Sequence, residues 1–112
     1  MRIALPTAEG RVCLHFGHCE AFALVDVDPE TQTIRSTTTA EPPEHAPGVL
    51  PRWLAQAGVD LVIAGGMGRR AQDLFGQYGI EVLVGAPSGE PEEVVRAYLD
   101  GSLKAGENIC DH

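Results

Sequence analysis

The stretch Asp60-Leu61-Val62-Ile63-Ala64-Gly65-Gly66-Met67-Gly68 decides the fold. Its first five residues form a nearly continuous apolar run, which is typical of a short parallel strand buried on both faces. The glycines that follow predict a tight loop. Beyond the loop, apolar residues recur at helical spacing until Gly79, at Ala71, Leu74, Phe75 and Tyr78. We therefore expect a strand, a loop and a helix in direct succession.

The alternation of strand and helix extends on both sides of this stretch. Upstream, one apolar helical face ends at Gly58, and Pro51 is tolerated because it falls in the first turn. That face consists of Val49, Leu50, Trp53, Leu54 and Ala57. Downstream, residues 80–84 predict another buried strand, and Pro91 opens a last helix that ends at Gly101. The inner face of this last helix consists of Val94, Val95, Tyr98 and Leu99.

The first forty residues predict an antiparallel meander of three strands. Residues 2–5 are apolar and stop at Pro6, residues 7–10 indicate a turn, and residues 21–28 form the second strand. The β-branched and partly polar residues 33–39 are typical of an exposed edge strand.

Together these elements predict one α/β domain, residues 1–112, with a mixed five-stranded sheet. An antiparallel meander followed by αβαβα gives such a sheet with helices packed on it and right-handed crossovers. We expect strand 60–64 to lie beside strand 2–5 and parallel to it. The loops at Thr7 and Gly65 would then border one crevice at the strand ends.

Charge excludes several classes of partner. The chain has 16 acidic and 8 basic residues, a formal net charge of −8. Such a surface repels phosphates, so neither nucleic acid nor a membrane is an expected partner. The apolar run at the N-terminus is too short for a signal peptide, and no spanning segment follows, so a cytoplasmic protein is expected. Three cysteines in a reducing compartment do not predict a disulfide framework.

Soft metal ligands are concentrated in two segments, Cys13-Leu14-His15-Phe16-Gly17-His18-Cys19 and Cys110-Asp111-His112. This distribution points to a metal or a metal–sulfur ligand. The five residues between Cys13 and Cys19 do not match the close spacing of a structural zinc knuckle. We expect Cys13 to be a small buried hydrophobe and Cys19 to be exposed. Whether Cys110 and His112 join the site is left open, as is the loop residue His45.

The loop at Gly65 is also a candidate anion site. From Gly66 it spells G-x-G-x-x-A between a strand and a helix, the local pattern of a dinucleotide-binding turn. Glycines let a ligand approach the backbone, and a helix start presents free N–H groups with partial positive charge. Arg69 and Arg70 add charge there. The alternative is a tight turn that only packs helix against sheet.

Patterns of catalysis are missing from the chain. Ser36, Ser88 and Ser102 lie in no nucleophile motif, and Asp26 and Asp28 have no third carboxylate placed beside them. We therefore do not expect an enzyme.

Several segments together resemble the dinitrogenase iron–molybdenum cofactor biosynthesis family. They are His15-Phe16-Gly17 with Phe22, residues 62–68, Tyr78-Gly79-Ile80 and Cys110-Asp111-His112. The resemblance implies a ribonuclease H-like fold and, as in small members from sulfate reducers, a molybdenum–copper–sulfide cluster without covalent attachment. An iron–molybdenum–sulfur cluster is the alternative.

Carried onto this chain, the resemblance places the ligand in a cleft near the glycine loop and the His/Cys segment. It nominates His15, His18 and Cys19 for the metal, and Gly66, Met67, Gly68, Arg69 and Arg70 for the cofactor. The function that follows is a non-enzymatic carrier or assembly scaffold for an anionic metal–sulfur cluster. The alternatives are a regulatory module that contacts a homologous protein or an ATPase and binds metal incidentally, and a dinucleotide-binding domain.

Overall fold

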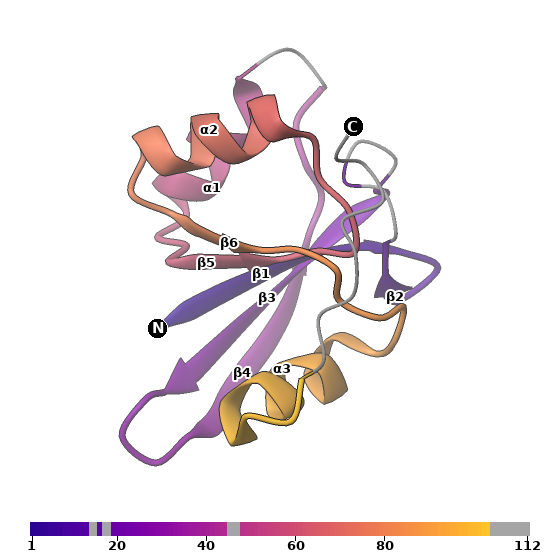
Figure 1. The fold of residues 1–112 in the computed structure, drawn as a ribbon, viewed down its shortest axis with the longest axis vertical. Helices are drawn as coiled ribbons and strands as arrows, with labels where there is room; N and C mark the ends of the chain where they lie inside the picture. The colour runs from indigo at the N-terminus through magenta and orange to yellow at the C-terminus, as the bar shows by residue number, and fades with distance from the viewer. Residues whose placement is uncertain (14–15, 17–18, 45–47, 104–112) are drawn as a thin grey trace.

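A computed structural model describes residues 1–13, 16, 19–44 and 48–103. In this part of the chain one mixed sheet separates two layers of helices (Figure 1). The helices α1 (Val49–Gln56) and α2 (Arg69–Gln77) cover one face, and α3 (Pro91–Asp100) covers the other. No helix among these residues has the length and apolar character needed to cross a membrane.

The sheet has the strand order β4-β3-β1-β5-β6, with the short β2 paired to β1 outside this path. The strands are β1 (Arg2–Ala8), β2 (Arg11–Val12), β3 (Ala21–Asp28), β4 (Thr33–Ala40), β5 (Leu61–Ile63) and β6 (Glu81–Leu83). Strands β1, β3 and β4 form the antiparallel meander, whereas β5 runs parallel to both β1 and β6. The expected α/β architecture is confirmed, including the parallel pairing of β5 with β1.

The first strand is longer than the sequence suggested. We expected it to stop before Pro6, but β1 continues to Ala8. The Pro6 carbonyl accepts from the Cys13 N–H, whereas the Thr7 carbonyl accepts from the Glu20 N–H next to β3. Successive residues of a strand point their hydrogen-bonding groups to opposite sides, so the N–H that proline lacks costs no bond to β3. The expected turn at residues 7–10 is therefore only Glu9 and Gly10, and the two-residue β2 that follows was missed.

Both faces of the central strands are buried, which explains their continuous apolar runs. Ile3 and Leu5 of β1 belong to the core under α3, whereas Ala4 between them belongs to the core under α1 and α2. Leu61 and Ile63 of β5 likewise face the α3 side, and Val62 faces the opposite side. Side chains of a strand alternate between the two faces of the sheet, so a strand covered on both faces needs apolar residues at successive positions.

The residues predicted on the inner helix faces are buried or half-buried, with one exception. Phe75 of α2 is fully buried, and Val94 and Val95 of α3 are also in the core. Tyr78 was expected on the inner face of α2 but is 45% exposed, because the helix ends at Gln77 and Tyr78 already belongs to its C-cap.

An ion pair joins β1, β3 and the end of α1 at the edge of the sheet where β1 begins. The Arg2 Nε atom lies 2.8 Å from Asp26 Oδ1, and the Arg2 guanidinium also donates to the Ala57 carbonyl just after α1. The pKa of Asp26 is lowered, first by the hydrogen bond from Arg2 and also by one from the Ser36 hydroxyl, although partial burial opposes this. Asp26 is therefore a structural carboxylate.

Replacing Asp26 by Asn should lower the free energy of unfolding at pH 7 by about 0.5–1 kcal/mol, as is typical of a half-exposed pair. A lowered pKa means that Asp26 stabilises the fold above its ordinary pKa and loses this effect as the pH falls through the folded-state value. The difference between the wild type and Asp26→Asn should thus shrink toward low pH in urea titrations. A difference that grows on acidification would contradict this, and Asp73→Asn on α2 serves as an exposed control.

Candidate functional site

The loops that follow β1 and β5 meet at one edge of the sheet, as the parallel pairing requires. The Gly65 N–H donates to the Cys13 carbonyl at 3.3 Å, and the Phe16 N–H donates to the Gly66 carbonyl at 2.9 Å. From the other side, the Gly85 N–H donates to the Gly65 carbonyl at 2.8 Å. The glycine loop is thus held between the segment after β2 and the segment after β6.

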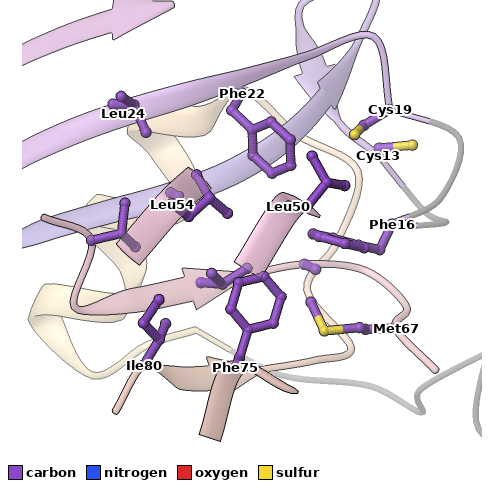
Figure 2. Packing of buried hydrophobic residues seen from close by; sticks show 14 residues of the cluster. Cys13, Phe16, Cys19, Phe22, Leu24, Leu50, Leu54, Met67, Phe75 and Ile80 are labelled. Atoms are coloured by element: carbon purple, nitrogen blue, oxygen red, sulfur yellow. The ribbon is translucent and has the colours of Figure 1, made fainter. Parts of the chain in front are cut away.

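The Phe16 side chain holds the junction between the glycine loop and the segment after β2 together from the side of the core. Its side chain is 7% exposed, and its ring makes edge contacts with Phe22 at 5.8 Å and with Phe75 at 5.6 Å between ring centroids. Figure 2 shows the ring of Phe16 between Leu50 and Met67. Phe16 and Phe22 were expected in the core, and both are buried there.

A groove of about 350 Å³ opens beside Phe16, between the first turns of α1 and α2. Its size falls within the range of small-molecule sites. The walls are mostly apolar and consist of Phe16, Gly48, Leu50, Pro51, Arg70, Ala71 and Leu74. This groove is the candidate site, since it borders both segments that the sequence nominated.

No side chain in the described part of the chain pairs with the positive charge at the groove. Arg70 lines the groove, whereas Arg69 does not, as the divergence of adjacent helical residues predicts. Neither guanidinium makes an ion pair or hydrogen bond with the described residues. Both flanking helices begin at a glycine, with no side-chain cap and no acidic residue in the first turn. In contrast, α3 begins with Glu92 and Glu93.

The members of the glycine loop lie in different environments. Gly66 and Met67 are buried, and Met67 is fully so. Because the Gly66 carbonyl accepts from the Phe16 N–H, the first glycine of the G-x-G-x-x-A pattern packs the loop against the segment after β2. Gly68 is exposed, and a Cβ atom there would meet nothing within 4 Å.

Cys19 is buried, contrary to expectation. Cys13 and Cys19 are each 8% exposed and belong to the core under α1 and α2. Burial and, to a smaller extent, the nearby Cys13 raise the pKa of Cys19 to about 11. The reason is that Cys19 lies two residues before β3, which pairs with β1, and its side chain turns inward beside Phe22 (Figure 2).

Several nominated ligands lie outside the described residues, namely His15, His18, His45, Cys110 and His112. Within the described ranges, no three His, Cys, Asp or Glu side chains are arranged to hold a metal ion.

A larger hollow of about 700 Å³ lies on the α3 side of the sheet. It is lined by Thr7, Glu9, Gly10, Glu20, Ala21, Ala23, Thr37, Thr39, Glu90, Pro91, Glu92, Glu93 and Arg96. Five carboxylates face one arginine, and that arginine is already paired with Glu92 at 3.1 Å. This hollow repels anions, so the smaller groove fits an anionic ligand better despite its size.

The α1 wall of the groove was missed from the sequence. The sequence predicts Leu50 on the inner face of a helix and Pro51 in its first turn, and it indicates no role for Gly48. A signal was nevertheless present, because a helix start that carries a glycine and a proline but no carboxylate leaves its partial positive charge available.

Comparison with known proteins agrees with this description. Residues 1–101 match the family model described as dinitrogenase iron-molybdenum cofactor. An uncharacterized protein of Methanocaldococcus jannaschii is 33% identical over 112 residues, covering 96% of this chain and 92% of that protein. The crystal structure of PH0822 superimposes with a TM-score of 0.87 at 31% identity, covering 96% of each chain. The apo form of the orange protein from Desulfovibrio gigas shares the fold, with a TM-score of 0.71 at 23% identity over 96% of this chain and 93% of that one.

Truncating Phe16 should destabilise the protein strongly. Phe16→Ala removes a buried ring that contacts two other rings, so we expect a loss of about 3–4 kcal/mol in the free energy of unfolding. Tyr78→Ala, which truncates an exposed ring, should cost less than about 0.5 kcal/mol. Chemical denaturation measures both, and equal losses would show that Phe16 does not hold the junction.

Proposed function

Because the chain belongs to the dinitrogenase iron–molybdenum cofactor family, we propose that it carries an anionic metal–sulfur cluster in the groove between α1 and α2. The observation that carries this proposal is the charge at the groove. In a chain of net charge −8, an apolar groove contains one guanidinium without a partner among the described residues, and it lies between two helix starts that have no side-chain cap. The protein is proposed to be a carrier or assembly scaffold, not an enzyme.

Electrostatics supports an anionic cargo. Each helix start presents about half an elementary positive charge, and both starts border the same groove. Arg70 adds a full charge, and Arg69 on the same first turn adds to the field. An anion that approaches an acidic protein needs such a local reversal of potential.

The apolar walls suit a cluster that brings its own sulfides. A thiometallate such as a molybdenum–copper–sulfide cluster needs no set of cysteine ligands from the protein. It needs a cation, backbone N–H donors and apolar cover that excludes water, because charge interactions strengthen where water is excluded. An iron–molybdenum–sulfur cluster is the alternative cargo and would use the same features.

Apart from the buried Cys19, each nominated residue then has a distinct part. Arg70 contacts the cluster, Arg69 contributes to the field, and Gly68 allows close approach. Gly66 and Met67 shape the loop from inside. His15 and His18 remain proposed metal ligands. A carrier must also deliver its cargo, so we expect a homologous protein or an ATPase to contact this same face.

Loss of Arg70 should weaken cluster uptake selectively. We expect Arg70→Ala to lower affinity about tenfold or more, because a hydrogen bond to a charged group contributes about 1.5–3 kcal/mol. Arg96→Ala removes the same charge from α3, on the opposite face, and should leave affinity unchanged. Anaerobic reconstitution with tetrathiomolybdate and copper, followed by visible absorption, measures both. If the double variant Arg69→Ala/Arg70→Ala takes up cluster normally while Cys19→Ser does not, the cluster is held by direct coordination to a thiolate and not by the arginines.

A methyl group at residue 68 should obstruct the cluster without harming the fold. Gly68 has φ −65°, and a Cβ there meets no atom within 4 Å, so Gly68→Ala should leave the thermal midpoint unchanged or slightly higher. Gly76→Ala near the end of α2 also meets no atom and should stabilise by about 0.5–1 kcal/mol. Only Gly68→Ala should reduce cluster uptake in the same reconstitution. Equal uptake by both variants would place the cluster away from this helix start.

A further inference from the structure

The four carbonyl oxygens of the glycine loop, residues 65–68, all accept hydrogen bonds from within the protein. Those of residues 65 and 66 accept from backbone N–H groups of the two neighbouring segments. The Gly68 carbonyl accepts from the Gln72 N–H at 3.1 Å, at the start of α2. The Met67 carbonyl accepts from the side chain of the same glutamine, whose Nε2 atom lies 2.9 Å from the oxygen. The loop therefore keeps its carbonyl oxygens engaged.

The N–H groups that follow have no such partners. Among the described residues, none accepts a hydrogen bond from the backbone N–H of Gly68, Arg69 or Arg70. The first N–H groups of a helix lack a partner within the helix, so water or a ligand can take them. The end of the loop thus offers hydrogen-bond donors while its acceptors are engaged, which suits an anion and not a cation.

The Gln72 side chain also fixes the direction of one of these N–H groups. No cis peptide bond occurs among the described residues, and in a trans peptide the C=O and the N–H point in opposite directions. Residues two apart in a helix are separated by about 200° around its axis, so Gln72 and Arg70 project from opposite sides of α2. Because the Met67 carbonyl is held on the Gln72 side, the Gly68 N–H points toward the side where Arg70 lines the groove.

We propose that Gln72 is a positioning residue that makes the groove selective for anions. This inference rests on the proposed function, because it concerns the same groove. Gln72 does not line the groove, so it acts through the peptide between Met67 and Gly68 and not by contact with the cargo. Rotation of that peptide changes the φ angle of Gly68, which glycine tolerates, and would turn a carbonyl oxygen toward the groove. The hydrogen bond from Gln72 opposes this rotation.

A pair of matched variants tests this role in the reconstitution with tetrathiomolybdate and copper. Gln72→Met keeps the length and neutrality of the side chain but removes the donor, and Gln77→Met makes the same change at the exposed far end of α2. We expect Gln72→Met to lower the affinity for the cluster about fivefold, as loss of one hydrogen bond to the ligand would, and Gln77→Met to leave it unchanged. If the wild type takes up no cluster, the proposed function fails and this role with it. Equal affinity of the wild type and Gln72→Met would refute only the role of Gln72.

A second measurement separates positioning from a general loss of structure. Isotope-labelled protein is titrated with tetrathiomolybdate alone, and NMR follows each backbone N–H. In the wild type the Gly68 amide proton should shift as the anion binds, whereas that of Gly76, near the other end of α2, should not. In Gln72→Met the Gly68 shift should shrink or vanish, and a shift as large as that of the wild type would contradict the proposal. Should the variant fail to fold, the wild type still decides, because an unmoved Gly68 amide would show that this N–H does not face the ligand.

Discussion

The parallel pairing of β1 with β5 is the constraint on which the rest of the structure depends. It places the carboxyl ends of both strands at one edge of the sheet, so the segment after β1 meets the loop at Gly65. The helix α2 begins at this edge because it follows that loop directly. The end of β4 also lies there, since Ala40 pairs with Phe22 and Phe22 with Pro6, so the chain leaves this edge toward α1. One strand pairing thus brings together two helix starts and Phe16.

Charge is distributed to match this geometry. Four arginines have acceptors in the described part of the chain, either a carboxylate or a backbone carbonyl, namely Arg2, Arg11, Arg35 and Arg96. The guanidinium groups of Arg52, Arg69 and Arg70 have none there, and all three residues lie on α1 or α2. The α3 side instead gathers five glutamates around its hollow. Charge is therefore distributed unevenly over this acidic protein, and the face that would receive an anion is the one whose arginines have no acceptor among the described residues.

The sequence predicted the fold well because its signals were local and strong. Continuous apolar runs, such as Leu61–Ile63, indicated strands buried on both faces, and glycines marked the ends of helices.

The features that the sequence did not predict depended on tertiary structure. Proline normally ends a strand, but Pro6 directs its missing N–H away from β3, and β2 is too short to leave a pattern. Cys19 follows Gly17 and His18, which indicated exposure, yet strand pairing turns it inward. The same limit applies to the groove, because Leu50 and Arg70 lie twenty residues apart and only the packing of α1 on α2 brings them together.

Locating molybdenum directly tests the central claim, that the groove between α1 and α2 receives the cluster. Crystals of protein reconstituted with tetrathiomolybdate and copper would be measured at the molybdenum absorption edge, where anomalous scattering locates the metal independently of the protein. The account predicts molybdenum in the groove, beside the Arg70 guanidinium and the first turn of α2. Molybdenum found in the hollow under α3, or bound through the sulfur atoms of Cys13 and Cys19, would contradict it.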